Sequence, residues 1–531
     1  MQLRSNLGDS GHRWIAGLVL MVTLAGSGHV SSAHAASAFG FEQVIAQAQA
    51  LSKKPYEKPK AVPAAAATIE RNTWSSIDFR NDAALWHGPE SSFEVQFFHA
   101  GSFYETAVAL NEINANSVRP IAFSKDGFVY PKQGMREALP NNIGYAGFRL
   151  HYPVNEPGKM DEVAVFLGAS YFRALGKGQA YGLSGRGVAI NTAMDDDEEF
   201  PAFREFWLEK PGPNAKQIKL YALLDGKHIT GAYEFVIRPG EATVMQVKSR
   251  LFPRKEIEKL GLGALTSMFM FGENSLSKLR DWRPEMHDSD GMLVVDGGGE
   301  WLWRPLVNPS ELASNSLYMN NPRGFGLIQK DRDFDHYHDL FDNYERRPNA
   351  WVTPSGDWGR GHVELVQIPS DSEQNDNIVA FWVPEQKIKR GQELSYDYEI
   401  SWNLERPVPP TAAQVLHTLV GEIPPHEEAP DRARRLAVDF AGGPLEKAGE
   451  DISVYAKITV GQGDDEGDEK GDNPEGKLMA SKVQQNPHTG GWRLEFDVLP
   501  DDDDDVLELR AYLADKQGKP LTETWSYALN Q

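Results

Sequence analysis

Carboxylates alternate with aromatic residues throughout the segment from Asp281 to Trp382. The polar stretches there include His287-Asp288-Ser289, Gly299-Glu300-Trp301 and Asn375-Asp376-Asn377. Such a mixture suits glycoside hydrolysis, because one carboxylic acid protonates the leaving oxygen, a second carboxylate activates water or attacks, and aromatic rings hold the sugar. Carboxylates of β proteins also sit on solvated faces or pair with arginine, so spacing alone selects no catalytic pair.

Other catalytic signatures are missing from the sequence. It contains no H-E-x-x-H, no P-loop and no G-x-S-x-G, and it has 0 cysteines, so thiolate chemistry is excluded. The glycine-rich stretch Gly182–Gly187 lacks the strand-then-helix setting of a dinucleotide site and is predicted to be a turn. The sequence shows no activated serine that could form a catalytic triad with His287, so we expect His287 to be hydrogen-bonded or to contact substrate. We expect no metal and no cofactor.

The first 35 residues have the features of a secretory signal. Arg4 and Arg13 precede an apolar run from Trp14 to Ala25, and Ala33-His34-Ala35 is an A-x-A cleavage site. The apolar run is shorter than the ~20 residues that a membrane span needs, and no later stretch is long enough. We therefore predict export of residues 36–531 to the periplasm by the general secretory route, without membrane insertion.

The net charge of −22 indicates which ligands the chain avoids. A chain this acidic repels phosphate backbones and anionic lipid heads, so binding to nucleic acid or to a membrane surface is not expected. A neutral ligand is therefore more compatible with this charge than an anionic one. The 13 Trp, 17 Tyr and 25 Phe provide flat faces on which sugar rings can stack, although core packing accounts for most aromatic residues of a large β protein.

The elements that must position these residues are mostly strands. Residues 41–51 have apolar positions at helical spacing and predict one amphipathic helix, and Arg254–Leu260 is a second, short candidate. From Ile77 onward the hydrophobic period is two, which is typical of antiparallel sheet. Residues 394–402 alternate apolar and polar, and 218–224 and 231–237 flank an Asp-Gly turn, so they predict a strand and a hairpin.

A proline-rich break divides the chain. Three prolines between residues 407 and 410 cannot continue a strand, so we predict a linker at 405–411 between a large domain, 36–404, and a small domain, 412–531. Alternating runs near residues 436–440, 452–460, 494–498 and 507–513 predict a β-sandwich of immunoglobulin-like size. The acidic runs at 464–469 and 501–505 lack calcium-loop spacing and are expected to be solvated loops.

Many short motifs in the chain resemble the MdoG/OpgG family, glucan biosynthesis proteins G and D. They extend from about Phe39 to the end of the chain and occur in the family's order. The matching stretches are Phe166–Arg173, Tyr181–Ser184, Glu198–Pro201, Tyr221–Asp225, Leu265–Phe269, His287–Ser289, Gly299–Trp301, Gly324–Leu327 and Glu523–Tyr527.

The resemblance implies an all-β protein with a galactose-mutarotase-like β-sandwich followed by a smaller immunoglobulin-like sandwich. It also implies a role in making osmoregulated periplasmic glucans, whose backbone is β-1,2-linked glucose. D-type members resemble inverting endo-hydrolases of this glucan. By motif, Asp376 is then the acid, Asp288 the base and Tyr344 a tyrosine near the reacting sugar, with a water chain carrying the proton where the carboxylates stand far apart.

Further residues of the same segment are predicted to bind substrate, namely His287, Trp301, Trp303, Arg347 and Trp382. The hypothesis requires both aspartates to flank one groove, and burial of either in an arginine pair would argue against it. The signal resembles that of G-type members, whereas 435–440 is similar to the D type. Two functions therefore stay open, a β-1,2-glucan hydrolase and a non-catalytic glucan-binding or scaffold protein beside a membrane glucosyltransferase.

Overall fold

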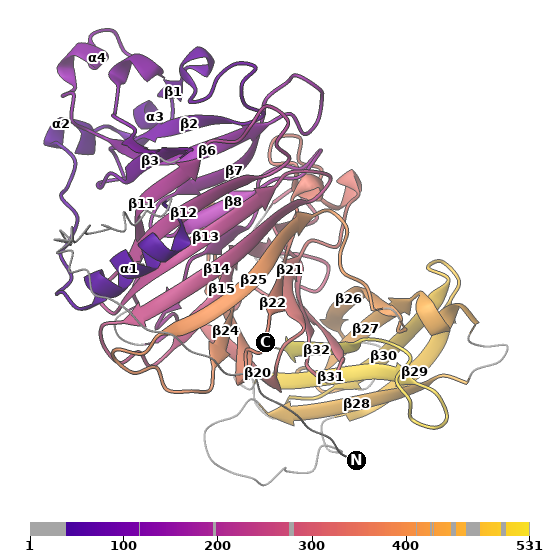
Figure 1. Cartoon of the computed structure of the whole chain (residues 1–531). Coiled ribbons are helices and arrows are strands. Elements are labelled where there is room, and N and C mark those ends of the chain that lie inside the picture. Colours follow the sequence, from indigo (N-terminus) through magenta and orange to yellow (C-terminus); the bar gives the residue numbers. More distant parts are fainter. Residues whose placement is uncertain are drawn as a thin grey trace, which may run out of the picture. The chain divides into compact units, whose positions relative to one another are not determined.

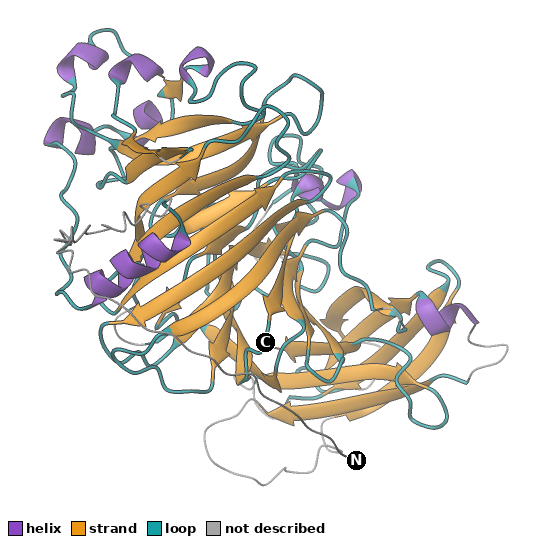
Figure 2. Cartoon of the chain, in the orientation of Figure 1, coloured by secondary structure: helices purple, strands orange, loops and turns teal. Residues whose placement is uncertain are grey.

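The computed structural model describes most of the chain after the predicted signal. The described residues are 39–115, 117–194, 198–275, 281–409, 411–424, 427, 429–447, 453–462, 478–500 and 506–529. The signal prediction and both acidic runs lie outside them. Strands dominate the described part (Figures 1 and 2), which confirms the all-β prediction.

One face of the large β-sandwich is a 10-stranded sheet. Its order is β2 (Glu94–His99), β6 (Tyr145–Tyr152), β7 (Asp161–Leu167), β8 (Tyr171–Ala174), β9 (Ser184–Arg186), β15 (Leu260–Ser267), β24 (Ile378–Pro384), β23 (Arg360–Gln367) and β20 (Ala313–Asn320), with β10 (Ala189–Ile190) beside β15. The predicted turn at Gly182–Gly187 therefore contains a short strand, because its backbone pairs with β8 and β15.

The second sheet has 14 strands and continues into the C-terminal part of the chain. Its order is β28 (Tyr455–Gln462), β31 (Leu507–Ala514), β32 (Thr524–Leu529), β19 (Trp301–Pro305), β18 (Gly291–Val295), β21 (Gly324–Ile328), β22 (Asn349–Ser355), β25 (Leu394–Asn403), β14 (Thr243–Pro253), β13 (Ile229–Arg238), β12 (Ile218–Asp225), β11 (Ala202–Glu209), β3 (Ala109–Asn114) and β4 (Ser117–Pro120). Strand β25 and the β12–β13 hairpin confirm the two strand patterns predicted for this region.

Smaller elements complete the fold. A four-stranded sheet contains β26 (Gln414–Glu422), β27 (Arg434–Ala441), β30 (Gly491–Val498) and β29 (Leu478–Asn486), and two-stranded pairs are β1 (Asp78–Phe79) with β5 (Phe128–Val129) and β16 (Phe269–Phe271) with β17 (Met286–His287). The α-helices are α1 (Phe41–Ser52), α2 (Ala64–Ala67), α3 (Arg71–Trp74) and α4 (Met135–Ala138). The 3₁₀ turns are η1 (Asn81–Ala83), η2 (Lys125–Gly127), η3 (Phe334–His336), η4 (Tyr344–Arg346) and η5 (Gly443–Lys447).

The predicted N-terminal helix is confirmed as α1, which lies against β12 and β13 (Figure 1). Its Val44 and Ala48 are buried with Tyr221 and Phe252. The predicted helix at Arg254–Leu260 is wrong, because Ile257 forms a β-bridge and the chain enters β15 at residue 260. Among the described residues, no helix is both long and apolar enough to cross a membrane.

The two large sheets pack face to face around one hydrophobic core. Phe166 of one sheet contacts Phe235 of the other with ring centroids 5.2 Å apart, and Trp382 and Trp402 are fully buried in the same core. A second core joins β18, β19 and β21 to C-terminal strands through Leu293 and Trp525. The likeness of these parts to galactose mutarotase and to immunoglobulin domains stays a prediction.

The prolines at 407 and 409 lie in a described segment without regular structure, but strand pairing connects the parts of the chain on either side of it. Strand β32 pairs in parallel with β19, so Trp525 lies beside Trp303 across the proposed boundary. Residues 39–531 form one compact unit in which the described strands cross-connect. The division at 405–411 therefore stays a prediction that unfolding experiments can test.

Candidate active site

An open, polar cavity of about 510 Å³ lies where β8, β17 and β24 approach one another. Both predicted catalytic aspartates, Asp288 and Asp376, line it. The other lining residues are Arg173, Tyr181, Gly182, Arg347, Glu373, Gln374 and Asn375. The structure thus brings together side chains that are up to about 200 positions apart in the sequence.

The backbone of two adjacent residues, Met268 and Phe269, holds both aspartates in position. The backbone N–H of Asp288, just after β17, donates to the carbonyl of Met268 at 2.8 Å. Asn377, the neighbour of Asp376, accepts from the N–H of Phe269 and donates to the Phe269 carbonyl, both at 2.9 Å. Because the two anchors are adjacent residues, the two carboxylates are held on the same wall of the sandwich.

Asp288 is nearly buried and forms an ion pair with Arg347. Burial disfavours the charged carboxylate, and nearby Asp376 adds repulsion, so the pKa of Asp288 is raised although Arg347 opposes both effects. This arginine pair is the arrangement that argues against Asp288 as a free base. Arg347 also lies 3.3 Å from a second carboxylate, that of Asp342, so it has an alternative partner.

Asp376 differs from Asp288 because its side chain is exposed to the cavity. The hydroxyl of Thr266 donates to Asp376 Oδ2 at 3.3 Å, and the described residues give this carboxylate no ion pair. It precedes β24 in a loop that also carries Glu373, Gln374 and Asn375. An exposed carboxyl at the mouth of a polar cavity is free to contact a leaving oxygen.

Tyr344 lies behind the cavity wall. Its side chain is 1% exposed, its hydroxyl donates to Glu373 Oε2 at 3.0 Å, and the Arg347 guanidinium lies 4.1 Å from its ring centroid. Burial raises the pKa of Tyr344, so the phenol stays protonated and donates this hydrogen bond. Tyr344 therefore contacts two residues that line the cavity without lining it.

Glu373, Arg173 and Tyr181 were not predicted as site residues. Arg283 contacts Glu373 and Asp339 at 2.9 Å each, which ties the Glu373 loop to the segment after η3. Arg173 and Tyr181 belong to the motif stretches quoted above, and that could have pointed to them. No sequence signal marks Glu373, because its role follows from a loop that only the fold brings to the cavity.

The structure does not support a substrate contact for His287. Its ring is fully buried and faces away from the cavity, between Gln329 Oε1 at 2.7 Å and Glu285 Oε2 at 2.8 Å. Burial disfavours the protonated ring, but the hydrogen bond and charge of Glu285 and the charges of Asp290 and Asp331 together outweigh this, and the pKa of His287 is raised. Neighbouring residues on an extended segment point to opposite sides, so His287 faces inward where Asp288 faces the cavity.

The structure also does not support the substrate contacts predicted for the three tryptophans. Trp303 and Trp382 are fully buried in the two cores, where no sugar ring can reach them. Trp301 is partly exposed but stacks on Trp351, with ring centroids 6.5 Å apart, and does not line the cavity. Only Arg347 of the five predicted substrate-binding residues lines it.

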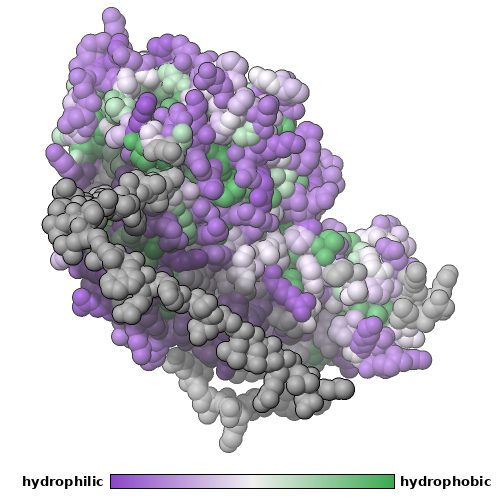
Figure 3. All heavy atoms as spheres, viewed as in Figure 1, coloured by the Kyte–Doolittle hydropathy of each residue, from purple (hydrophilic) through white to green (hydrophobic). Residues whose placement is uncertain are grey.

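Exposed rings do occur close to the cavity. Trp282 is 68% exposed and precedes Arg283, which contacts Glu373. Phe341 is 89% exposed and lies two residues after Asp339, another partner of Arg283. An exposed ring at the edge of a polar cavity can stack on sugar C–H groups. The described residues on the face of the molecule shown in Figure 3 are mostly hydrophilic.

One cluster in the described part of the chain has the composition of a cation site. Potential ligand atoms of Glu285, Asp331 and His336 lie within 4.8 Å of one another. The hydrogen bond to Glu285 raises the pKa of His336 to about 9. Burial alone would raise the pKa of Glu285, but hydrogen bonds from His287 and His336 lower it to about 2. A cation would have to displace these protons, so the cluster is better described as a buried ion-pair network.

Fold and cavity together define an all-β sandwich protein with an open cavity lined by carboxylates, arginines and amides. The chain belongs to the family described as "Periplasmic glucan biosynthesis protein, MdoG", whose model matches residues 39–529. It is similar to the glucans biosynthesis protein G of Ralstonia nicotianae (strain ATCC BAA-1114 / GMI1000), with 45% identity over 505 residues, 94% of this chain and 98% of the relative. The family resemblance seen in the sequence is therefore confirmed.

Proposed function

We propose that this protein acts in the periplasm on the glucan whose biosynthesis its family serves, as an inverting endo-hydrolase of β-1,2-glucan. The observation that supports this most is the shared cavity of Asp288 and Asp376, open to solvent and lined by hydrogen-bonding side chains. Inverting hydrolysis needs an acid at the leaving oxygen and a base that activates water from the opposite face of the sugar.

The two carboxyls suit different roles. In this proposal Asp376, which is exposed, protonates the glycosidic oxygen, and Asp288, which is nearly buried, accepts the proton of the attacking water. Asp288 can serve as base only when Arg347 shifts toward Asp342, its second partner. Glu373, held by Tyr344 and Arg283, borders the space that water would occupy between them.

A second candidate function follows from the ion pair itself. If Arg347 stays on Asp288, Asp288 is not available as the base, and the cavity binds glucan without cleaving it. The protein would then be a glucan-binding or scaffold protein that assists a membrane glucosyltransferase. The same cavity serves both functions, so an activity measurement separates them.

The experiment incubates purified protein with linear β-1,2-glucan and follows the release of reducing ends. We expect release by the wild type and at least a hundredfold slower release by Asp376→Asn, since general acid catalysis contributes about 10²–10⁴-fold. Asp371→Asn is the matched control, because this exposed aspartate belongs to the same loop and does not line the cavity. Glucan binding without turnover in every variant would favour the scaffold function.

A further inference from the structure

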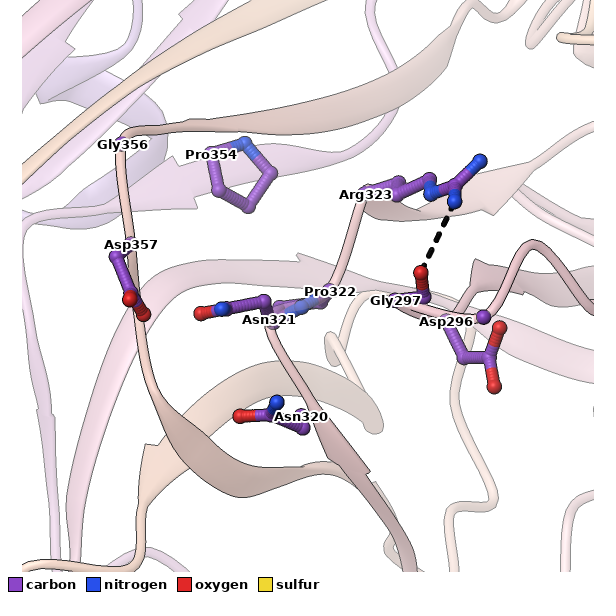
Figure 4. A pocket seen from close by; sticks show the side chains of 10 residues that line it. Asp296, Gly297, Asn320, Asn321, Pro322, Arg323, Pro354, Gly356 and Asp357 are labelled. Carbon is purple, nitrogen blue, oxygen red and sulfur yellow. Dashed lines mark hydrogen bonds between the residues drawn. The ribbon is translucent and has the colours of Figure 1, made fainter.

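A second hollow, with a volume of about 720 Å³, lies at the far end of the strands that carry the candidate active site. Three chain segments line it: residues 296–298 of the β18–β19 hairpin turn, and residues 320–323 and 354–357, which connect strands of the two large sheets. Figure 4 shows the side chains of Asn320, Asn321, Arg323 and Asp357 around this space. None of its lining residues belongs to the candidate active site.

Neighbouring strands connect the two places. Asp288 precedes β18 and Asp296 follows it, while Arg347 precedes β22 and Asp357 follows it. Strand β21 runs between them in the opposite direction, starting after Arg323. A strand advances about 3.3 Å per residue, so the hollow lies roughly 20 Å or more from the candidate active site. The two places therefore cannot contact the same sugar residue.

Hydrogen bonds hold the segments around the hollow in place. Several polar side-chain atoms of the same segments take no part in these bonds. Asn321 Oδ1 and Asp357 Oδ1 both accept from the backbone N–H of Gly359, at 2.7 and 2.8 Å. Gly297 lies directly against the 320–321 turn, where a Cβ would be 2.1 Å from the Asn320 carbonyl. In the described part of the chain, Asn321 Nδ2, Asp357 Oδ2 and the Asn320 amide have no hydrogen-bond partner.

Arg323 adds a donor to this set. Its Nη2 donates to the Gly297 carbonyl at 3.0 Å (dashed in Figure 4), and the described residues give it no ion pair. Asp296 and Asp357 belong to no cluster of three metal-ligating side chains among the described residues. Amide, carboxylate and guanidinium groups in one open hollow suit the hydroxyls of a neutral sugar better than an anion or a metal ion.

An exposed aromatic ring stands next to the hollow. Tyr318 is 77% exposed on β20, the edge strand of its sheet, and its ring centroid lies 4.8 Å from that of His362 on β23. Tyr318 and Asn320 are two positions apart, so they project from the same face of β20, and both are exposed. A flat ring beside free hydrogen-bonding groups is the combination that holds a sugar unit.

We infer that this hollow, with Tyr318 as its stacking platform, is a second saccharide-binding site that holds a distant segment of the same glucan chain. The inference rests on the proposed function only in taking β-1,2-glucan as the polymer. A chain long enough to reach both places binds the protein at two points, whereas a short oligosaccharide occupies the active-site cavity alone. The second site thus gives preference for long chains.

The test measures affinity by titration calorimetry in an Asp376→Asn background, which prevents turnover. The probes are linear β-1,2-glucan polymer and a short β-1,2-gluco-oligosaccharide. Tyr318→Ala and, separately, Asn320→Ala should weaken polymer binding about tenfold, because the second contact of a tethered chain acts at a high effective concentration. Neither variant should change the affinity for the oligosaccharide.

Tyr455→Ala is the matched control, since Tyr455 is 51% exposed on β28 and lines none of these hollows. Polymer affinity unchanged in both test variants, or no polymer binding at all, overturns the inference. The outcome is separable from that of the proposed function. Weaker polymer binding by Tyr318→Ala in a protein without hydrolytic activity supports the second site alone, and full activity with no effect of Tyr318→Ala supports hydrolysis alone.

Discussion

The ion pair between Asp288 and Arg347 determines what chemistry the cavity can perform. Arg347 contacts Asp288, Asp342 and the ring of Tyr344, so one guanidinium links most of the buried polar side of the cavity. Burial disfavours the protonated form of Arg347, but Asp288, Tyr344 and Asp342 together outweigh this, and the pKa of Arg347 is raised. The arginine therefore stays charged, and its position decides whether Asp288 is available as a base.

Replacing Arg347 by methionine should destabilise the protein strongly. The change leaves Asp288 buried without its partner, and breaking a buried pair from one side costs about 3–5 kcal/mol. Urea denaturation of Arg347→Met, Asp288→Asn and the double variant measures this. The double variant should lose less stability than Arg347→Met alone, and equal losses in both would show that the pair is not the cause.

Asp331 predicts a pH dependence of stability. Its side chain is nearly buried, and burial and Asp290 raise its pKa to about 6 against the opposing effect of Lys330. The unfolded chain releases this proton near pH 4, so between about pH 4 and 6 the folded state holds more protons than the unfolded state. The contribution of Asp331 to the free energy of unfolding is therefore lost as pH rises from about 4 to 6, by roughly 3 kcal/mol at most.

The measurement compares urea denaturation of the wild type and Asp331→Asn at several values between pH 4 and 7. The asparagine variant carries no charge to bury, so its stability relative to the wild type should increase as pH rises. Asp371→Asn, an exposed aspartate, should follow the wild type throughout. Parallel curves for the wild type and Asp331→Asn would contradict the assignment.

At the scale of elements, the proline-rich segment is fixed by side chains although it has no regular structure. Arg406 donates to both oxygens of Glu523, at 3.1 and 2.7 Å, and the N–H of Val415 donates to Glu523 at 2.7 Å. Arg406 also lies 5.1 Å from the ring centroid of Trp303, as Lys330 does. The segment is thereby attached to β19 and to the strands that follow it.

Glu523→Ala should destabilise the protein by about 3–5 kcal/mol, because it leaves Arg406 and the Val415 N–H without their acceptor in a buried place. Glu523→Gln keeps one acceptor oxygen and should cost clearly less. Chemical denaturation of the two variants gives the comparison. A loss of the same size in both would mean that charge, and not the acceptor geometry, carries the stabilisation.

At the scale of the whole molecule, the 14-stranded sheet joins the large sandwich to the C-terminal strands. The β19–β32 pairing and the second core, which includes Leu293, Trp303 and Trp525, require both parts of the chain. We expect a single cooperative unfolding transition in calorimetry for a protein of residues 36–531.

A fragment of residues 36–404 tests this directly. It would lack β32 and expose Leu293 and Trp303 of the second core, so we expect it to unfold at a lower temperature than the whole chain or to aggregate. A fragment that unfolds at the temperature of a separate transition of the whole chain would instead support two independent domains divided at 405–411.

The sequence alone determined the local structure and the chemical composition of the site. Period-two patterns located β25, the β12–β13 hairpin and, after residue 411, β27, β28, β30 and β31, because alternation depends only on neighbouring side chains. The family motifs brought attention to Asp288 and Asp376, and the structure places both at one cavity. Whether they catalyse hydrolysis stays a prediction.

Only the tertiary structure decided which polar and aromatic side chains reach solvent. Burial is set by the partner sheet and not by the residue's own type, so Trp303, Trp382 and His287 are inside while Trp282, Phe341 and Tyr318 are outside. The pairing of Asp288 with Arg347, 59 positions away, likewise has no local cause. Long-range packing therefore determines which side chains are exposed and which ionisable groups are paired, and no short stretch of sequence encodes either property.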